Sequence, residues 1–171
     1  VSRKDERKPL RLKEIDYSKE DRISLGMPEV DRLLGGGIVP GSLVLVGGEP
    51  GIGKSTLSLQ IPLCCPSLGT LYVTGEESAR QVKMRADRLS SGGKRPGGQA
   101  ADADNVDILC ETNIDNIIEE AAANRPELMI VDSVQTMYAS SMESTPCSPG
   151  QIKEVGAMLL RFAKESGGPV I

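Results

Sequence analysis

The sequence contains no histidine and no tryptophan, and its aromatic residues are one phenylalanine and three tyrosines. Without histidine, the chain supplies no imidazole metal ligand, no histidine general base and no Ser-His-Asp triad. With so few aromatic side chains, we expect a core of Leu, Ile, Val, Met and Ala. The 171 residues suffice for one α/β domain, and the apolar share of 39% is ordinary.

Cysteines and long apolar runs are also scarce. The four cysteines show no CxxC spacing, which argues against a zinc site, and we expect buried free thiols: Cys64, Cys65, Cys110 and Cys147. No apolar run is long enough to span a bilayer, and the first residues lack the apolar centre of a secretory signal. The net charge of −4 argues against a surface that is basic throughout, although a local nucleic-acid groove stays possible.

The N-terminal residues 1–22 are charged and weakly patterned, with six Lys or Arg among the first thirteen. A solvated linker is a simpler interpretation of them than a nucleic-acid-binding arm. The chain starts without methionine, which is consistent with a fragment. From Ile23 the pattern becomes globular, so we expect one domain over residues 23–171.

Within this domain, short apolar runs alternate with amphipathic segments. The runs predict strands at 43–48, 70–77, 106–110 and 127–133, and a further strand beginning at 169. The amphipathic segments predict helices at 28–34, 54–61, 77–90, 113–126 and 150–166, with Pro62 limiting the second and Ser148 capping the last. We expect loops at 91–104 and 138–150. Strands that alternate with helices predict βαβ units and a parallel sheet.

The stretch GGEPGIGKST, residues 47–56, is the strongest chemical signal. Its spacing Gly48-x4-Gly53-Lys54-Ser55 is that of a P-loop, in which glycines let successive N–H groups point at phosphate oxygens. It also lies between an expected buried strand and an expected helix, whose N-terminus favours anions. Lys54 is placed to reach the β- and γ-phosphates, and Ser55 to ligate Mg²⁺. The alternative, a flexible glycine-rich turn, does not account for this context.

Two acidic positions follow other expected strands. Asp132 ends the run LMIVD, and in a doubly wound sheet it would lie beside the P-loop and hold Mg²⁺ through water. Glu76 and Glu77 follow the run TLYVTG, where a glutamate can polarise the water that attacks the γ-phosphate. We favour Glu76 as this base because it is nearer the strand end. Acids at a helix start are an alternative explanation for the pair. Gln135 is either a γ-phosphate sensor or a solvated side chain.

Several separated motifs, in order, resemble the RecA-like ATPase core of the bacterial RadA (Sms) family of DNA-repair proteins. They are LGGGIVPGSLVLVGGEPGIGKSTL, YVTGEES, IVDSVQTMY and SPGQIKEVGAMLLRFAKE. The resemblance covers residues 21–171, nearly all of the expected domain. It implies a RecA-like P-loop α/β fold, and a DNA-dependent ATPase in a hexameric ring that drives branch migration of recombination intermediates. It also implies ATP and Mg²⁺, single-stranded or branched DNA as partner, and bacterial cytoplasm or an organelle of bacterial descent.

The resemblance also implies roles for individual residues. The nucleotide-binding loop corresponds to Gly48, Glu49, Pro50, Gly51, Ile52, Gly53, Lys54, Ser55 and Thr56. Glu76 and Lys54 correspond to the catalytic residues, and Ser55 and Asp132 to the Mg²⁺-binding positions.

The chain departs from the family pattern in several places. The family's upstream four-cysteine zinc element is absent, as are its downstream Lys-Asn-Arg-Phe-Gly motif and Lon-protease-like domain. The loop at 139–150, which corresponds to a DNA-facing loop in RecA folds, has no Lys or Arg. The loop at 91–104 looks like an insertion.

A further departure concerns the sheet. In RecA-like sheets the strand that follows the Asp132 strand lies between it and the P-loop strand, and here it spans only residues 169–171. We therefore expect unpaired backbone groups, marginal stability and little ATPase turnover. Three alternatives remain open: a nucleotide-binding chain without turnover, another RecA-fold ATPase such as a replicative helicase, and, less fittingly because no lid is evident, a small-molecule kinase.

Overall fold

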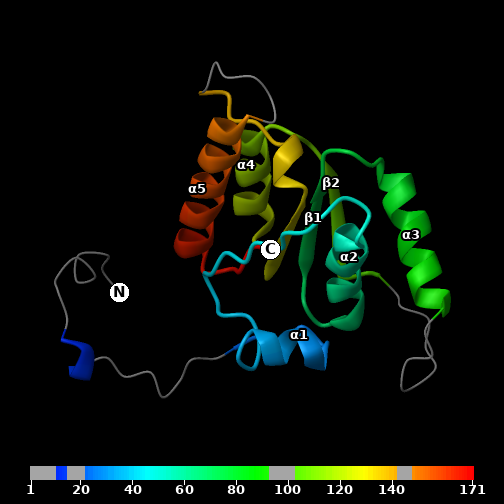
Figure 1. Ribbon diagram of the computed structural model, residues 1–171, viewed down its shortest axis with the longest axis horizontal. Coiled ribbons are helices and arrows are strands. Elements are labelled where there is room, and N and C mark those ends of the chain that lie inside the picture. Colours follow the sequence, from blue (N-terminus) through cyan, green and yellow to red (C-terminus); the bar gives the residue numbers. More distant parts are fainter. Residues whose placement is uncertain (1–10, 15–21, 93–102, 142–147) are drawn as a thin grey trace.

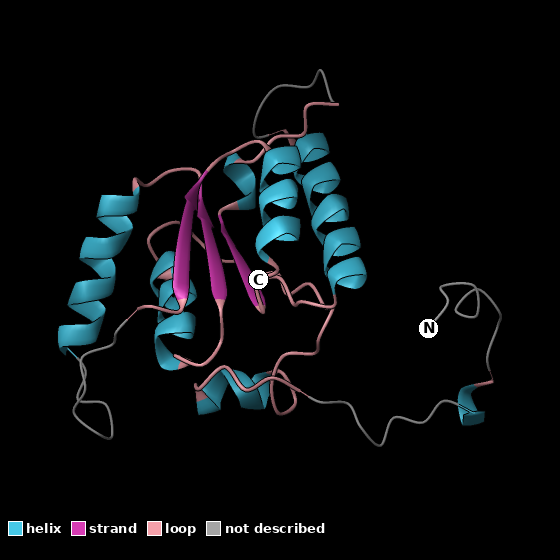
Figure 2. Ribbon diagram, turned by 180° about the vertical axis from the view of Figure 1, so that it is seen from behind, coloured by secondary structure: helices cyan, strands magenta, loops and turns pink. Residues whose placement is uncertain are grey.

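The computed structural model describes residues 11–14, 22–92, 103–141 and 148–171, and within them three parallel strands form a sheet in the order β2-β1-β3. The strands are β1 (Thr70–Thr74), β2 (Val106–Cys110) and β3 (Leu128–Asp132). The α-helices are α1 (Pro28–Leu33), α2 (Lys54–Cys64), α3 (Ala79–Gly92), α4 (Ile114–Asn124) and α5 (Pro149–Ser166). Two short 3-10 helices are η1 (Leu12–Glu14) and η2 (Val134–Thr136). The layers are helix, sheet, helix (Figures 1 and 2).

The two faces of the sheet follow from the alternation of side chains along each strand. In β1, Leu71 and Val73 join the core with α4 and α5, whereas Tyr72 joins the core with α2 and α3. All five residues of β1 are buried, because it is the central strand. In β3, Leu128 and Ile130 share the face of Tyr72. The same alternation puts Asp132, two residues further along, on the face covered by α2.

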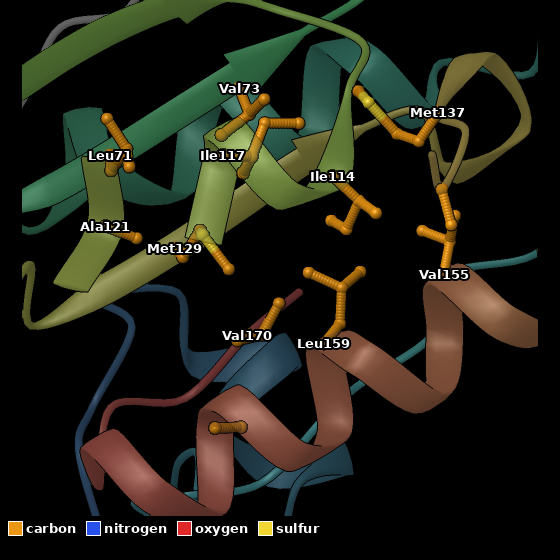
Figure 3. Close-up of a cluster of buried hydrophobic side chains, with 12 residues drawn as sticks. Leu71, Val73, Ile114, Ile117, Ala121, Met129, Met137, Val155, Leu159 and Val170 are labelled. Atoms are coloured by element: carbon orange, nitrogen blue, oxygen red, sulfur yellow. The ribbon is translucent and has the colours of Figure 1, made fainter. Parts of the chain in front are cut away.

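Both cores are aliphatic, as the composition predicts. The core beneath α4 and α5 (Figure 3) includes Leu71, Val73, Ile114, Ile117, Ala121, Met129, Val155, Leu159 and Val170. The core beneath α2 and α3 includes Leu59, Ile61, Leu63, Tyr72, Val82, Ala86, Leu128 and Ile130. The one aromatic side chain that is fully buried in the described residues is Tyr72.

The expected strand at 43–48 is not formed as such, and this prediction was wrong. Leu43 makes a single parallel bridge to Val170, and Val44 N–H donates to the Val170 carbonyl at 2.8 Å. Beyond that point Leu45 is 81% exposed. A continuous apolar run forms a ladder only as far as a neighbouring strand accompanies it, and here pairing ends at Val44.

The position of residues 169–171 confirms the expected strand order. Val170 bridges Met129 on one side and Leu43 on the other, both in parallel. The segment therefore lies between β3 and the chain that enters the P-loop. This order brings the C-terminal end of β3 and the phosphate-binding loop to the same edge of the molecule.

α2 also differs from expectation, because it begins at Lys54 but continues through Pro62 to Cys64. A proline within a helix removes one amide donor and crowds the preceding turn. Here Pro62 stands in the last turn, where little helix follows. Its own carbonyl accepts from Cys65 N–H at 3.2 Å and from the side-chain amide of Asn105 at 3.1 Å.

The other elements agree with the sequence to within a few residues at their ends. β1 stops at Thr74 and α3 starts at Ala79, so both glutamates of TGEES lie in the connection between them. The cap of α5 is confirmed, since the Ser148 hydroxyl accepts from Gln151 N–H. The expected loops extend outside the described residues over 93–102 and 142–147, and so does the linker over 1–10 and 15–21. No described helix is both long and apolar enough to cross a membrane.

The three cysteines within the described residues are free thiols, and none of them is fully buried. Cys64 and Cys110 are exposed, and Cys65 is half-buried. Cys64 and Cys110 are the last residues of α2 and β2, and these ends of the helix and the strand lie at the surface. Cys147 lies outside the described residues.

Candidate functional site

The site begins at the loop that precedes α2. Gly51 and Gly53 have φ of +79° and +103°, a backbone conformation that glycine adopts without strain. A Cβ on Gly48 would meet Ile52 Cγ2 at 3.2 Å, so the loop is curled closely on itself. Gly53 is the N-cap of α2 and has no side chain to cap it, which leaves the first amides of the helix facing outward. The loop thus has the form of an anion cradle.

Lys54 is the first residue of α2, and its side chain folds back over the cradle. The ammonium Nζ donates to the carbonyls of Gly48 at 2.7 Å and Glu49 at 2.8 Å. A cation is therefore held at the mouth of the loop, where phosphate oxygens would compete for it with these carbonyls. The rest of the predicted loop residues are placed around it: Pro50, Gly51, Ile52 and Gly53 are exposed, and Ser55 and Thr56 are half-buried in α2.

Ser55 and Asp132 meet across the sheet edge. Ser55 Oγ donates to Asp132 Oδ1 at 3.0 Å, although the two residues are 77 positions apart in the chain. Asp132 is the last residue of β3 and is in register with Thr74, the last residue of β1. Its side chain is 15% exposed. The structure thus brings together the two residues that the sequence suggests for Mg²⁺.

The second oxygen of Asp132 is held by residues that the sequence analysis did not identify. Tyr72 Oη donates to Asp132 Oδ2 at 2.6 Å, and Arg85 Nη2 donates to Tyr72 Oη at 3.1 Å. Burial raises the pKa of Tyr72 strongly, and its hydrogen bond to the Asp132 carboxylate raises it further, so the phenol remains a donor. Tyr72 is recognisable from sequence only through the alternation that puts it on the face of Asp132.

The two candidate glutamates have different environments. Glu77 Oε2 forms a 2.7 Å ion pair with Arg85 Nη2. Glu76 is exposed, and its carboxylate has no hydrogen bond or ion pair within the described residues. Both line a polar cavity of about 250 Å³ together with Ser55, Thr74, Arg85 and Asp132. This difference favours the Glu76 choice made from sequence, because Glu77 is engaged elsewhere.

The connection from β1 to Glu76 is tightly fixed. A Cβ on Gly75 would overlap Thr136 Oγ1 and lie 2.9 Å from Thr112 Cγ2. Thr136 belongs to η2, the segment that follows Asp132, and Gln135 beside it is exposed. Glycine is therefore required at position 75, between the end of β1 and the two glutamates.

The donor set suits Mg²⁺. A serine hydroxyl and a carboxylate within 3.0 Å are hard oxygen donors at the entrance of a phosphate cradle. The described residues contain no cluster of three or more His, Cys, Asp or Glu placed to hold a metal ion. Mg²⁺ commonly takes only one or two protein ligands and completes its shell with phosphate oxygens and water, which fits this arrangement.

Comparisons with known proteins agree with this geometry. A family model described as AAA domain matches residues 6–171. The chain belongs to the AAA domain family. It is RadA-like: DNA repair protein RadA of Escherichia coli strain K12 is 45% identical over 163 residues, which are 94% of this chain and 33% of that protein. RadA of Bacillus subtilis strain 168 is 42% identical over 165 residues, 95% of this chain and 34% of that protein.

A third relative, RadA of a Synechocystis species, is 42% identical over 164 residues, 91% of this chain and 32% of that protein. The RadA-like chain thus spans about a third of the length of the relatives it matches. Its parallel sheet between two helical layers is the RecA-like α/β architecture that the motifs suggested.

Proposed function

We propose that this chain is the nucleotide-binding part of a DNA-dependent ATPase that acts in recombination and repair. The observation that carries the proposal is the 3.0 Å hydrogen bond from Ser55 to Asp132. It joins the phosphate cradle to the acid at the end of β3, which is the arrangement that a P-loop ATPase needs. Similarity to proteins named DNA repair protein RadA supports the repair role.

The residues of the cradle have distinct tasks. The amides between Gly48 and Thr56 bind the β-phosphate, and Lys54 moves from the carbonyls of Gly48 and Glu49 to the β- and γ-phosphate oxygens. Ser55 would ligate Mg²⁺, and Asp132 would hold the ion through water. When bound, the ion neutralises charge on the phosphates.

Glu76 is the proposed general base. It faces the cavity that also contains Ser55 and Asp132, and its carboxylate is unpaired within the described residues. A carboxylate there accepts a proton from the water that attacks the γ-phosphate. Glu77 is less suited, because its carboxylate is already engaged in the 2.7 Å ion pair with Arg85.

The motor function rests on resemblance. We propose that nucleotide turnover drives branch migration of DNA within a homo-oligomeric ring, with single-stranded or branched DNA as the partner. The loop at 139–150, which enters α5, is the candidate for DNA contact, and half of it, residues 142–147, lies outside the described residues.

A second candidate function is nucleotide binding without turnover by this chain. The specific observation in its favour is that the chain entering the P-loop pairs only at Leu43 and Val44, while Leu45 is 81% exposed. A loosely held cradle binds phosphate but positions it poorly for reaction.

The test is a calorimetric titration of Mg²⁺–ATP into the chain, into Lys54→Ala and into the control Lys164→Ala, an exposed residue of α5. We expect wild-type and control to bind, and Lys54→Ala to lose at least about tenfold in affinity. Hydrolysis that rises on addition of single-stranded DNA supports the motor, and binding without DNA-stimulated hydrolysis supports the second candidate. Equal binding by all three variants, or none by the wild type, overturns the proposal.

A further inference from the structure

Arg85 of α3 is the one cation among the described residues that line the polar cavity of about 250 Å³ beside the phosphate cradle. Its side chain is 14% exposed. Its Nη2 atom lies 2.7 Å from Glu77 Oε2, 3.1 Å from Tyr72 Oη and 3.8 Å from Asp132 Oδ2. One guanidinium nitrogen thus contacts both acids and the phenol that joins one of them.

A second nitrogen of the same guanidinium has no such contacts. Arg85 Nε is buried and has no hydrogen-bond partner within the described residues. The position of the group therefore depends on its contacts to Glu77, Tyr72 and Asp132. Removing a guanidinium from water costs free energy, and this cost offsets much of the energy of its ion pairs. Packing alone is therefore a poor explanation for a largely buried arginine with these partners.

The network fixes the orientation of Asp132. Tyr72 accepts from Arg85 and donates to Asp132 Oδ2, so this oxygen is engaged on the α3 side. The other oxygen, Oδ1, then faces Ser55. Turning the carboxylate would break the bonds on both sides at once.

Charge balance points to the same role. Three carboxylates face the cavity, those of Glu76, Glu77 and Asp132. Without Arg85, Glu77 would carry an uncompensated charge in a partly buried place and would be released toward the phosphate and Mg²⁺ positions. With Arg85 present, Glu76 is the one acid of this cavity whose carboxylate has no partner among the described residues.

We propose that Arg85 is a positioning residue that acts through Tyr72 and Glu77: it orients Asp132 toward Ser55 and withholds Glu77 from the reacting phosphate. This inference rests on the proposed ATPase function and deepens it. It assigns the selection of Glu76 over Glu77 to one arginine of α3.

The experiment measures binding of a fluorescent ATP analogue as a function of Mg²⁺ concentration, with thermal unfolding of the nucleotide-free chain beside it. The variants are Arg85→Gln, Glu77→Gln, their combination and Tyr72→Phe. The matched control is Arg88→Gln, an exposed position of the same helix. We expect Arg85→Gln to weaken Mg²⁺-dependent binding by about 10- to 100-fold, the range for loss of charge-assisted hydrogen bonds.

The decisive result is rescue. Because Glu77→Gln removes the uncompensated charge but not the loss of the contact to Tyr72, the double variant should recover part of the binding that Arg85→Gln loses, measured at a temperature at which every variant is folded. Tyr72→Phe removes one oxygen and should raise the Mg²⁺ concentration needed, even if Arg85→Gln fails to fold. Binding by Arg85→Gln equal to that of Arg88→Gln, or no rescue by Glu77→Gln, would overturn the inference.

Failure of the proposed function is separately visible. If the wild-type chain binds no nucleotide, the ATPase proposal fails, and the thermal unfolding data still test whether Arg85 and Glu77 are coupled. Non-additive changes in melting temperature for Arg85→Gln and Glu77→Gln support their coupling, and additive changes overturn it.

Discussion

The strand that carries Asp132 and the chain that carries the phosphate cradle are held in very different ways. β3 pairs with β1 along its whole length, from Leu128 to Asp132, and β1 pairs equally with β2. The chain entering the P-loop pairs only near Leu43, and Leu45 soon after is 81% exposed. The acid is thus positioned by the sheet, whereas the cradle is positioned by α2 and by the contact of Ser55 with the acid.

The difference matters for function because the two regions must meet within hydrogen-bond distance. The fully paired sheet supplies Asp132, Tyr72 and the start of the segment that carries the glutamates. The weakly paired chain before α2, together with the start of α2, supplies the phosphate-binding amides and Lys54. Nucleotide, which would contact both regions, is then expected to stabilise the cradle more than the sheet.

The largest expected contrast compares two apolar truncations. Ile130→Ala in β3 removes a side chain that is 1% exposed, and it should lower the free energy of unfolding by about 2–5 kcal/mol. Leu45→Ala, in the chain entering the cradle, should change it by no more than about 0.5 kcal/mol. Urea unfolding of both variants checks this. A loss of similar size at Leu45 would show that this segment is buried in solution and would remove the contrast.

The next largest effect is expected at the junction of the fully paired sheet with the glutamates. Gly75→Ala would drive a methyl group into Thr136 Oγ1 and against Thr112. Overpacking of this kind costs about 1–3 kcal/mol, and it should also weaken hydrolysis by displacing Glu76. Thermal unfolding and ATP turnover measure the two effects. Adding Thr136→Ala should restore part of the stability, and a Gly75→Ala variant as stable as the wild type would contradict the packing seen here.

A smaller, pH-dependent effect is expected at Glu111, directly after β2. Its carboxylate accepts from Thr112 N–H at 2.7 Å, Asn113 N–H at 2.9 Å and Asn116 Nδ2 at 2.9 Å. The backbone bond from Asn113, then the bonds from Asn116 and Thr112, hold the pKa of Glu111 below its usual 4.5. A lowered pKa means that this stabilisation is present above the ordinary pKa and disappears as pH falls through the lowered value.

Glu111→Gln should therefore lower the free energy of unfolding at pH 7 by about 1 kcal/mol, and by progressively less as the pH falls through the lowered pKa of Glu111. Thermal unfolding across this range, with the exposed Glu119→Gln of α4 as control, measures the difference. A gap between wild type and variant that stays constant with pH would rule out a role for the ionised carboxylate.

The sequence was sufficient for the parts of the site that depend on spacing. The P-loop follows from glycines at fixed intervals, and Asp132 follows because the carboxyl ends of parallel strands share one edge of the sheet. Tyr72 and Arg85 were missed for a physical reason. A tyrosine in a buried strand is typical of core, and an arginine in a helix is typical of surface. The register of β1 and β3 puts Tyr72 beside Asp132, and the packing of α3 brings Arg85 to both of them.

Two predictions were wrong for separate reasons. An apolar run forms a strand only where a neighbouring strand runs alongside, so LVLVGG was predicted as a strand and forms a single bridge in the structure. The cysteines were wrongly expected to be buried because of their residue type. Cys64 and Cys110 have the composition of core residues, yet they occupy the last positions of their elements and are exposed.

The smallest expected effect has the opposite sign and tests the weakly paired chain before α2 directly. Gly156 lies inside α5 and lines a cavity of about 100 Å³ between the chain entering the cradle and β3, with Leu43 and Val131 among its neighbours. Apart from its chain neighbours and the backbone of its own helix, no atom of the described residues lies within 4 Å of a Cβ built on it. Gly156→Ala should raise the free energy of unfolding by about 0.5–1 kcal/mol, because alanine favours a helix and restricts the unfolded chain. Urea unfolding of Gly156→Ala and Gly75→Ala compares the same added methyl group at two sites. It should destabilise the protein at Gly75, where Thr136 fills the space, and stabilise it at Gly156, where the space is open. If Gly156→Ala is destabilising instead, the space between α5 and the chain entering the cradle is filled in solution.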